Sequence, residues 1–249
     1  MPMTIFVAGA AGAVGRPLCL LLKQAGHDVY GTTRKAEAAA WLRSAGVTPV
    51  LLDVFDAAAV KATVREARPD AIVHQLTDLS AGFDAEGLKR NADIRRVGTR
   101  NLVEAAAAAG VGRIVAQSIA WVYAPGPDPH TESDPLNTDA DGTAAISMAG
   151  VIALEDAVLG AAGSTGIVLR YGYFYGPGTG SDGPRPGDLP TVHVDAAASA
   201  ALLAIEKGRK GIYNVAEPCA SVASNKARSE LGWDHASRLG ADATRPPRR

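Results

Sequence analysis

The sequence predicts an α/β protein built on one doubly wound parallel sheet. Short apolar runs alternate with alanine-rich helical stretches along most of the 249 residues. The runs are apolar throughout, which is typical of strands that helices cover on both faces. Repeated β-α units of this length connect right-handedly into a single sheet. A chain of this size can bury a sizeable core without disulfide bonds.

The first half of the chain reads as four β-α units. Gly26, Gly46 and Gly110 each follow a helical run, where a left-handed cap favours a residue without a Cβ. Asp56 and Asp84 precede helices and are predicted N-caps. The strands are predicted at residues 4–9, 28–34, 48–53 and 70–76, and the helices at 13–26, 35–46, 56–67 and 84–110.

The second half continues the pattern with longer loops. A strand is predicted at 113–119, a helix around 147–155 and a sixth strand at 166–176. Residues 124–142 and 176–190 are rich in Pro, Asp and Gly. Such segments form surface loops, and we expect the first of them to cover a site.

Composition narrows the classes of partner. The net charge is −1 and the isoelectric point about 6.5, so no basic face for nucleic acid is implied. Cys19 and Cys219 lie far apart and form neither a disulfide framework nor a CxxC zinc motif, and no metal site is predicted. The chain shows no uninterrupted apolar run of about 18 residues. We therefore expect no membrane span and a cytoplasmic location.

The stretch "VAGAAGAVG" predicts a dinucleotide site. It places Gly9, Gly12 and Gly15 between an apolar strand and an amphipathic helix. Glycines permit a tight turn and close approach of the backbone to a pyrophosphate, and the helix N-terminus supplies N–H donors and positive potential. The spacing GxxGxxG differs from the commoner GxGxxG. The prediction of a dinucleotide site therefore rests on the place of the glycines, after an apolar strand and before an amphipathic helix, and not on the glycine triplet alone.

The end of the second strand favours NADP, with NAD as the alternative. An acidic residue there would bind the ribose hydroxyls of NAD, but the sequence is "YGTTRK", with Arg34 and Lys35. Arg34 can pair with a 2′-phosphate and stack on adenine, or it can be a solvated surface charge. Asp53 follows the third strand and either accepts from the adenine amino group or caps a turn.

At this point the chain resembles the extended short-chain dehydrogenase/reductase family, the NAD(P)-dependent sugar epimerases and dehydratases. Besides the glycine turn, the matching pieces are "NADIRRVGTRNLVEAA", "RIVAQSIAWVY", "IALEDAV", "LRYGYFYGPGT", "HVDAAASAALLAI", "GIYNVAEP" and "KARSELGW". The resemblance implies a Rossmann-like doubly wound sheet and a small-molecule substrate. It implies a cofactor along Gly9, Ala11, Gly12, Ala13, Val14, Gly15, Arg34, Asp53, Val54, Gln75, Leu76, Thr77, Ser118, Tyr171 and Tyr173.

The resemblance also suggests a domain division and an assembly. Residues 1–170 are the expected NAD(P)-binding domain. Residues 171–249 are the expected substrate lobe, interleaved with the last Rossmann elements. This C-terminal substrate lobe is reduced, because only short segments separate "YGPGT" from "HVD" and follow "YNV". A homodimer through helices at about 88–109 and 144–162 is possible by the same resemblance.

The chain departs from the family at its catalytic pair. Family members carry a tyrosine and, four residues later, a lysine that holds the nicotinamide ribose and lowers the pKa of the tyrosine. None of the six tyrosines has a lysine four residues on. Counting back from Glu155, the two positions hold Ser147 and Val151. The family's Ser or Thr at the end of the fifth strand is Ile119, with Ser118 one residue earlier.

An enzyme with this sequence therefore needs another proton donor. Ser118 and Tyr123 are the catalytic candidates, and Tyr171, Tyr173 and His130 are further groups near the expected site. His74 is more typical of a satisfied core histidine. Two functions stay open: an NAD(P)-dependent oxidoreductase or epimerase/dehydratase-like enzyme acting on a small carbonyl or hydroxyl compound, and a non-catalytic NADP(H)-binding sensor or scaffold.

Overall fold

Seven parallel strands form the central sheet of the protein. The structure is a computed structural model that describes residues 1–78 and 84–240. The strand order is β3-β2-β1-β4-β5-β6-β9, and all neighbouring pairs are parallel. The predicted doubly wound sheet is confirmed. Its strands are β1 (Thr4–Ala8), β2 (Asp28–Thr33), β3 (Thr48–Leu51), β4 (Ala71–His74), β5 (Arg113–Ile119), β6 (Thr165–Tyr171) and β9 (Gly211–Val215).

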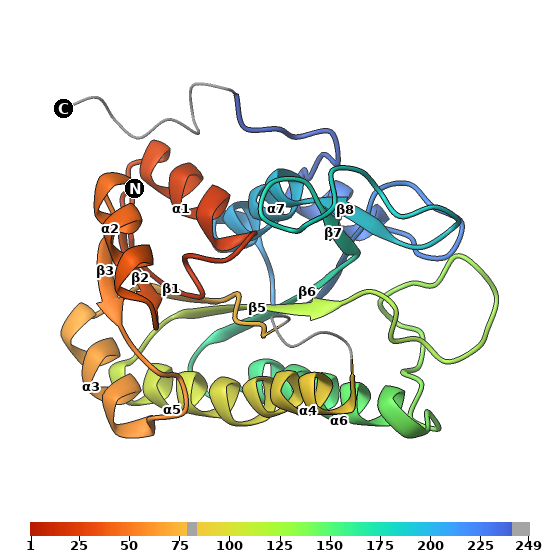
Figure 1. Cartoon of the computed structure of the whole chain (residues 1–249), viewed down its shortest axis with the longest axis horizontal. Coiled ribbons are helices and arrows are strands. Elements are labelled where there is room, and N and C mark those ends of the chain that lie inside the picture. The colour runs from red at the N-terminus through yellow and green to blue at the C-terminus, as the bar shows by residue number, and fades with distance from the viewer. Residues whose placement is uncertain (79–83, 241–249) are drawn as a thin grey trace.

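Helices cover both faces of this sheet (Figure 1). Successive strand residues point to opposite faces, so Ile5 and Val7 of β1 belong to one core cluster and Phe6 and Ala8 to the other. The first face carries α1 (Gly15–Gln24), α2 (Ala36–Ser44) and α7 (Val194–Lys207). The second carries α3 (Ala57–Ala67), α4 (Ala85–Asp93), α5 (Thr99–Ala109) and α6 (Gly142–Leu159).

The predicted sixth strand is wrong in one respect, because the structure divides it at Gly172. β6 ends at Tyr171, and β7 (Tyr173–Tyr175) pairs with β8 (Thr191–His193) in a separate small sheet. A Cβ on Gly172 would lie 2.7 Å from the backbone of Pro190. The glycine therefore lets two backbone segments cross, which the local pattern of apolar residues does not reveal.

The predicted helix at 84–110 is continuous but contains a π-helical turn at Ile94–Gly98 between α4 and α5. Val54 packs against this turn, since a Cβ on Gly98 would lie 3.0 Å from its side chain. The two predicted N-caps are confirmed: Asp56 accepts from the Ala59 N–H and Asp84 from the Gly87 N–H. Single π-turns inside helices frequently mark functional sites.

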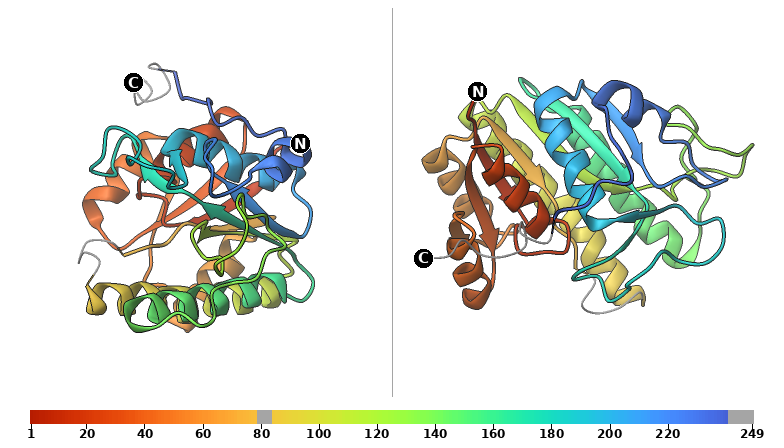
Figure 2. Two further views of the ribbon diagram at one scale, coloured as in Figure 1. Left: turned by 90° about the vertical axis from the view of Figure 1, so that its right-hand side faces the viewer. Right: turned by 90° about the horizontal axis from the view of Figure 1, so that it is seen from above.

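The C-terminal part of the chain supplies both sheet and lobe. β9 and α7 belong to the main layers, whereas β7, β8 and the loops 124–142 and 176–190 gather beyond the carboxyl ends of β5 and β6 (Figure 2). The 124–142 loop is tied to the segment after β9, because His130 exchanges backbone hydrogen bonds with Ser221 and Ala223. Residues 241–249 of the predicted lobe lie outside the described residues.

Helix α6 alone among the described helices is long and apolar enough to cross a membrane, with a mean hydropathy of 1.5. Core helices of globular proteins pass the same test. Here α6 packs against α4 and β5 and buries Val151, Leu154, Glu155 and Val158. Only 28% of the helix is buried inside the structure, so part of its apolar surface is not covered by the described residues.

Candidate functional site

The glycine turn joins β1 to α1 in a conformation that needs glycine twice. Gly9 has φ of +89°, and a Cβ there would lie 2.8 Å from the carbonyl oxygen of Gln75. A Cβ on Gly15 would overlap the carbonyl oxygen of Gly9. The turn is closed by the Gly12 N–H, which donates to that same oxygen at 3.0 Å. Side chains at Gly9 and Gly15 are therefore excluded by backbone packing.

The same turn presents unused hydrogen-bond donors. In the described chain, the N–H groups of Ala11, Ala13 and Val14 have no partner. They surround the N-terminus of α1, where the helix dipole places positive potential. Free N–H groups and a cradle that tolerates no side chain fit the pyrophosphate of a dinucleotide. The residues present therefore suit the cofactor that the sequence predicts.

The residues that follow β4 form the side of the candidate site next to the glycine turn. The Gln75 N–H donates to Ala8 at 2.8 Å, which brings Gln75, Leu76 and Thr77 beside the glycine turn. His74 is buried, and its ring contacts the Thr99 hydroxyl at 3.0 Å and accepts from the Leu76 N–H. Burial, assisted by nearby Arg95, lowers the pKa of His74 to about 4. The predicted satisfied core histidine is confirmed.

A pocket of about 390 Å³ opens between the carboxyl end of β2 and α4. Arg34, Phe55 and Asp78 line it together with residues of α4 and the π-turn. Arg34 lies 3.8 Å from Asp78. The charged groups of the lining are four cations, Arg34, Lys89, Arg90 and Arg96, and two carboxylates, Asp78 and Asp93.

Asp53 and Val54 directly precede Phe55, which lines this pocket. The Asp53 carboxylate accepts from the Phe55 N–H at 3.0 Å, which is the turn-capping alternative of the sequence analysis. Val54 is buried, and its carbonyl accepts from the Asn101 amide. The capping contact uses one oxygen of Asp53, so contact with a bound adenine by the other oxygen stays a prediction.

A buried polar network links the carboxyl ends of β5 and β6 to α6. The Ser118 hydroxyl donates to Glu155 Oε1 at 2.7 Å. Arg170 donates twice to the same carboxylate, from Nε at 3.0 Å and from Nη2 at 2.6 Å. All three side chains are almost fully buried. Burial opposes the charge of Arg170, but the hydrogen bonds and charge of Glu155 outweigh it and raise the pKa of the guanidinium.

Tyr123 lies at the edge of this network. Its hydroxyl donates to Asn214 Oδ1 at 2.5 Å. Its ring stacks on the ring of His130, and the guanidinium of Arg170 lies over the Tyr123 ring at 5.1 Å from the centroid. Burial raises the pKa of Tyr123, although Arg170 opposes the shift. The hydroxyls of Ser118 and Tyr123 thus both already donate within the protein, and the pKa of Tyr123 is raised rather than lowered. Their assignment as catalytic groups stays a prediction.

The two tyrosines at the end of β6 differ in surroundings. Tyr171 is buried, and its hydroxyl donates to Ala197 in α7. Burial raises the pKa of Tyr171 well above its usual range, outweighing the nearby Gln75 amide. Tyr173 stacks on Trp121 with ring centroids 3.7 Å apart, and Arg185 lies 4.2 Å from the Tyr173 ring. Tyr173, in β7, therefore lies against the 176–190 loop, whereas Tyr171 belongs to the core.

An arginine that is not among the sequence-predicted site residues contacts Ser147. Arg95, from the π-turn, is 5% exposed, and its Nη1 donates to the Ser147 hydroxyl at 3.4 Å. Val151, in the lysine position, is fully buried. A charged residue on the buried face of a predicted helix was the available signal, since Arg95 follows buried Asn91 by four positions.

Comparison with known proteins gives a family match over most of the chain. The sequence model of the NAD dependent epimerase/dehydratase family matches residues 5–190. A 3-diazoavenalumate denitrifying reductase from a Streptomyces species is 38% identical over 235 residues, covering 86% of this chain and 76% of that protein.

Solved structures share the fold. A UDP-glucose 4-epimerase from Thermotoga maritima, solved with UDP-glucose, superposes with a TM-score of 0.77 at 20% identity, covering 95% of this chain and 94% of the other. A UDP-glucose 4-epimerase from Stenotrophomonas maltophila, with bound NAD and a formylated UDP-arabinopyranose, gives 0.78 at 20% identity and the same coverage. A dTDP-glucose 4,6-dehydratase from Streptomyces venezuelae, with NAD, gives 0.75 at 20% identity and covers 97% and 94%.

Proposed function

The chain belongs to the NAD dependent epimerase/dehydratase family and is an enzyme of this NAD(P)-dependent kind, and from that premise we propose that it is an NADPH-dependent reductase of a small molecule. One observation carries the proposal. The cradle for the pyrophosphate is intact, with free N–H groups at Ala11, Ala13 and Val14, whereas the positions of the proton-relaying pair hold Ser147 and Val151.

This combination favours hydride transfer without protonation by the protein. The bound reduced nicotinamide supplies the hydride. The hydroxyls of Ser118 and Tyr123 are occupied by Glu155 and Asn214, and Val151 leaves no lysine to acidify a neighbour. A carbonyl acceptor, the class expected from the family resemblance, needs a proton on its oxygen. An acceptor that loses a leaving group does not.

The reductase relative suggests such an acceptor. It is named as a denitrifying reductase of a diazo compound. Replacing a diazonium group by hydrogen forms one C–H bond and breaks the C–N bond, whose electron pair leaves with N₂. The balance needs a hydride and no proton. We therefore place aryl diazonium compounds ahead of simple carbonyl compounds as substrates of this chain.

The choice of NADPH over NADH rests on the pocket at Arg34. Its lining has four cations and two carboxylates, and Glu86 outside the lining pairs with Arg90, so an excess of positive charge remains that favours an anionic group such as a 2′-phosphate. Arg34 follows β2, where NAD-selective proteins carry an acid. We expect Arg34→Ala to weaken NADPH binding by about 10–100-fold, as loss of a charge-assisted contact does, and to weaken NADH binding less in the same titration, because NADH lacks the 2′-phosphate.

The reaction is tested with deuterated NADPH and benzenediazonium, beside benzaldehyde as a carbonyl acceptor, with no-enzyme controls. The proposal predicts enzyme-dependent deuterium on the ring carbon that lost N₂, and slower or no reduction of benzaldehyde. Rapid benzaldehyde reduction with no enzyme-dependent denitrification would favour the carbonyl reductase instead. Tight NADPH binding with neither reaction would favour the sensor or scaffold.

The setting is proposed on the same family resemblance. We propose a cytoplasmic protein that acts on a small molecule and forms a homodimer through the outer faces of α4, α5 and α6. Light scattering at several protein concentrations measures the mass of the assembly. A monomer throughout would remove the dimer from the proposal.

A further inference from the structure

We propose that Arg95 replaces the missing lysine and binds the nicotinamide-ribose half of the cofactor, with Ser147 as its positioning residue. The inference rests on the proposed function, because it assumes that a dinucleotide lies along the glycine turn. It goes further in assigning the vacant catalytic position to a residue from a different element of the fold.

The π-turn brings Arg95 to the right place. Its Nη1 donates to Ser147 Oγ at 3.4 Å, on the face of α6 where the family carries its tyrosine. Its charge also acts on the ring of His74, at the carboxyl end of β4. The guanidinium therefore lies against α6 at Ser147 and within electrostatic range of the end of β4, after which Gln75 and Leu76 lie beside the glycine turn.

Close packing of α6 against α4 leaves space for the Arg95 side chain beside Ser147. A Cβ on Gly150 would lie 2.8 Å from Cα of Ala92 and 3.4 Å from Cδ of Arg95, so α6 and α4 approach closely there. Val151 is fully buried, so a lysine at that position would place its charged ammonium group in the apolar core. A serine ends several bonds short of a tyrosine hydroxyl, which leaves space for the guanidinium beside Ser147.

The donors of Arg95 are largely unused. A guanidinium has five N–H donors, and the bond to Ser147 is the one hydrogen bond that Arg95 makes to the described residues. The other nitrogens of Arg95 have no hydrogen-bond partner among the described residues, and they are not fully enclosed by the protein. They therefore keep access to solvent. A buried cation with open donors favours oxygen ligands.

No carboxylate of the described chain neutralises Arg95 at short range. Glu155 attracts it, but that carboxylate already accepts two hydrogen bonds from Arg170 and one from Ser118. No ion pair within 4.0 Å involves Arg95 among residues 1–78 and 84–240. The hydroxyl oxygens of a ribose are acceptors that match the free donors.

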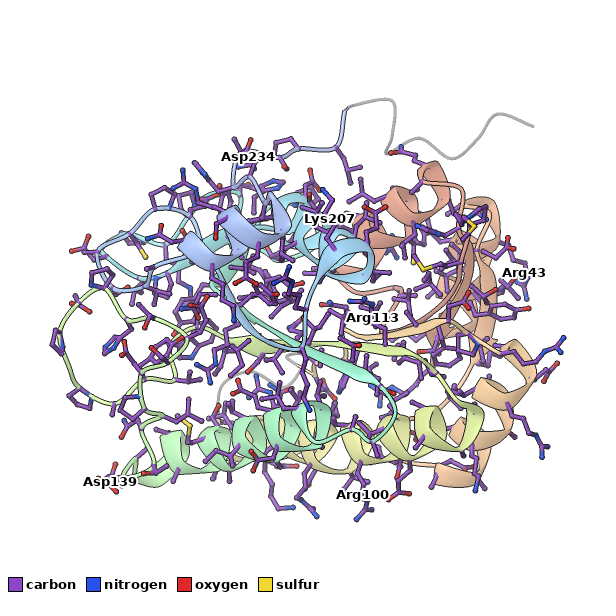
Figure 3. The ribbon with its side chains drawn as sticks, turned by 180° about the vertical axis from the view of Figure 1, so that it is seen from behind. Arg43, Arg100, Arg113, Asp139, Lys207 and Asp234 are labelled. Atoms are coloured by element: carbon purple, nitrogen blue, oxygen red, sulfur yellow. The ribbon has the colours of Figure 1, made fainter. Side chains whose placement is uncertain are left out.

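The test separates the two halves of the cofactor. Calorimetric titration compares NADPH with adenosine 2′,5′-bisphosphate, which lacks the nicotinamide riboside. We expect Arg95→Met to weaken NADPH by about 10–100-fold, the loss of charge-assisted hydrogen bonds, and to leave the bisphosphate unchanged. Arg95→Lys should recover part of the affinity. The matched control is Arg43→Met, an exposed arginine of α2 outside the proposed dimer faces (Figure 3).

The role of Ser147 is tested in a double-mutant cycle. Ser147→Ala should weaken NADPH in the wild-type background and have no further effect beside Arg95→Met, because it acts through the arginine. Equal losses for both ligands in a folded Arg95→Met or Arg95→Lys protein would overturn the inference and assign Arg95 a structural role. Unchanged NADPH affinity in both variants would also overturn it. Failure of the wild type to bind either ligand would instead reject the proposed function.

Discussion

Glu155 is the residue on which the interior of the site depends. One carboxylate accepts hydrogen bonds from Ser118 and Arg170, and α6, β5 and β6 meet there. The sequence identifies Glu155 as part of a family motif, and from it the vacant positions at Ser147 and Val151 can be counted. It does not reveal the pair with Arg170, because a fixed contact between a helix and a later strand is set by tertiary packing.

Glu155→Gln tests the strength of this buried pair. The variant leaves the charge of Arg170 without a carboxylate, and breaking one side of a buried pair costs about 3–5 kcal/mol. The matched control is Glu86→Gln, which removes a partner of Arg90 on the surface of α4. A surface pair contributes at most about 1 kcal/mol. Urea unfolding of both variants measures the difference, and equal free energies of unfolding would contradict the account.

His74 makes stability depend on pH. Its pKa lies at about 4 in the folded protein against an ordinary value of 6.5, so the unfolded chain binds the proton more tightly between these values. Stability is therefore fully present above pH 6.5 and declines as pH falls toward 4, by at most about 1.4 kcal/mol per pH unit. His74→Gln should flatten this decline in unfolding measurements across the window. An unchanged slope would show that other groups cause it.

At the scale of elements, the local pattern predicts the strands and helices but not their interruptions. Apolar runs and capping residues identify the β-α units because each is a property of neighbouring residues. The division of the sixth strand at Gly172 depends on Pro190, and the π-turn packs against Val54. Both partners come from other parts of the chain, so the local pattern predicts one unbroken strand and one uninterrupted helix.

Gly150→Ala tests the close approach of α6 and α4. Helix propensity alone predicts a gain of about 1 kcal/mol for this change in a helix interior. The contact predicts the opposite sign, because the new Cβ would lie 2.8 Å from the backbone of Ala92 and overpacking costs about 1–3 kcal/mol. Thermal unfolding decides between them. A raised melting temperature would show that the two helices separate without cost.

For the whole molecule, the site assembles from strand ends that the topology brings together. β1 and β4 are neighbours in the sheet, and there the chain reverses its direction of strand addition, where doubly wound sheets bind ligands. The glycine turn and Arg34 can be predicted as cofactor-binding residues from the sequence, because each directly follows an apolar strand. Arg95 and the pocket cations of α4 reach these strand ends through the packing of a separate helix layer, which no local motif encodes.

The central claim is that this fold keeps a working NADPH site although the family's catalytic pair is gone. The most direct measurement is a titration of the purified protein with NADPH and with NADH, followed by nicotinamide fluorescence. The account predicts saturable binding of both, with NADPH about 10-fold or more tighter because of the cationic pocket at Arg34. Absence of binding to either dinucleotide would contradict it, since the intact glycine turn would then serve no cofactor.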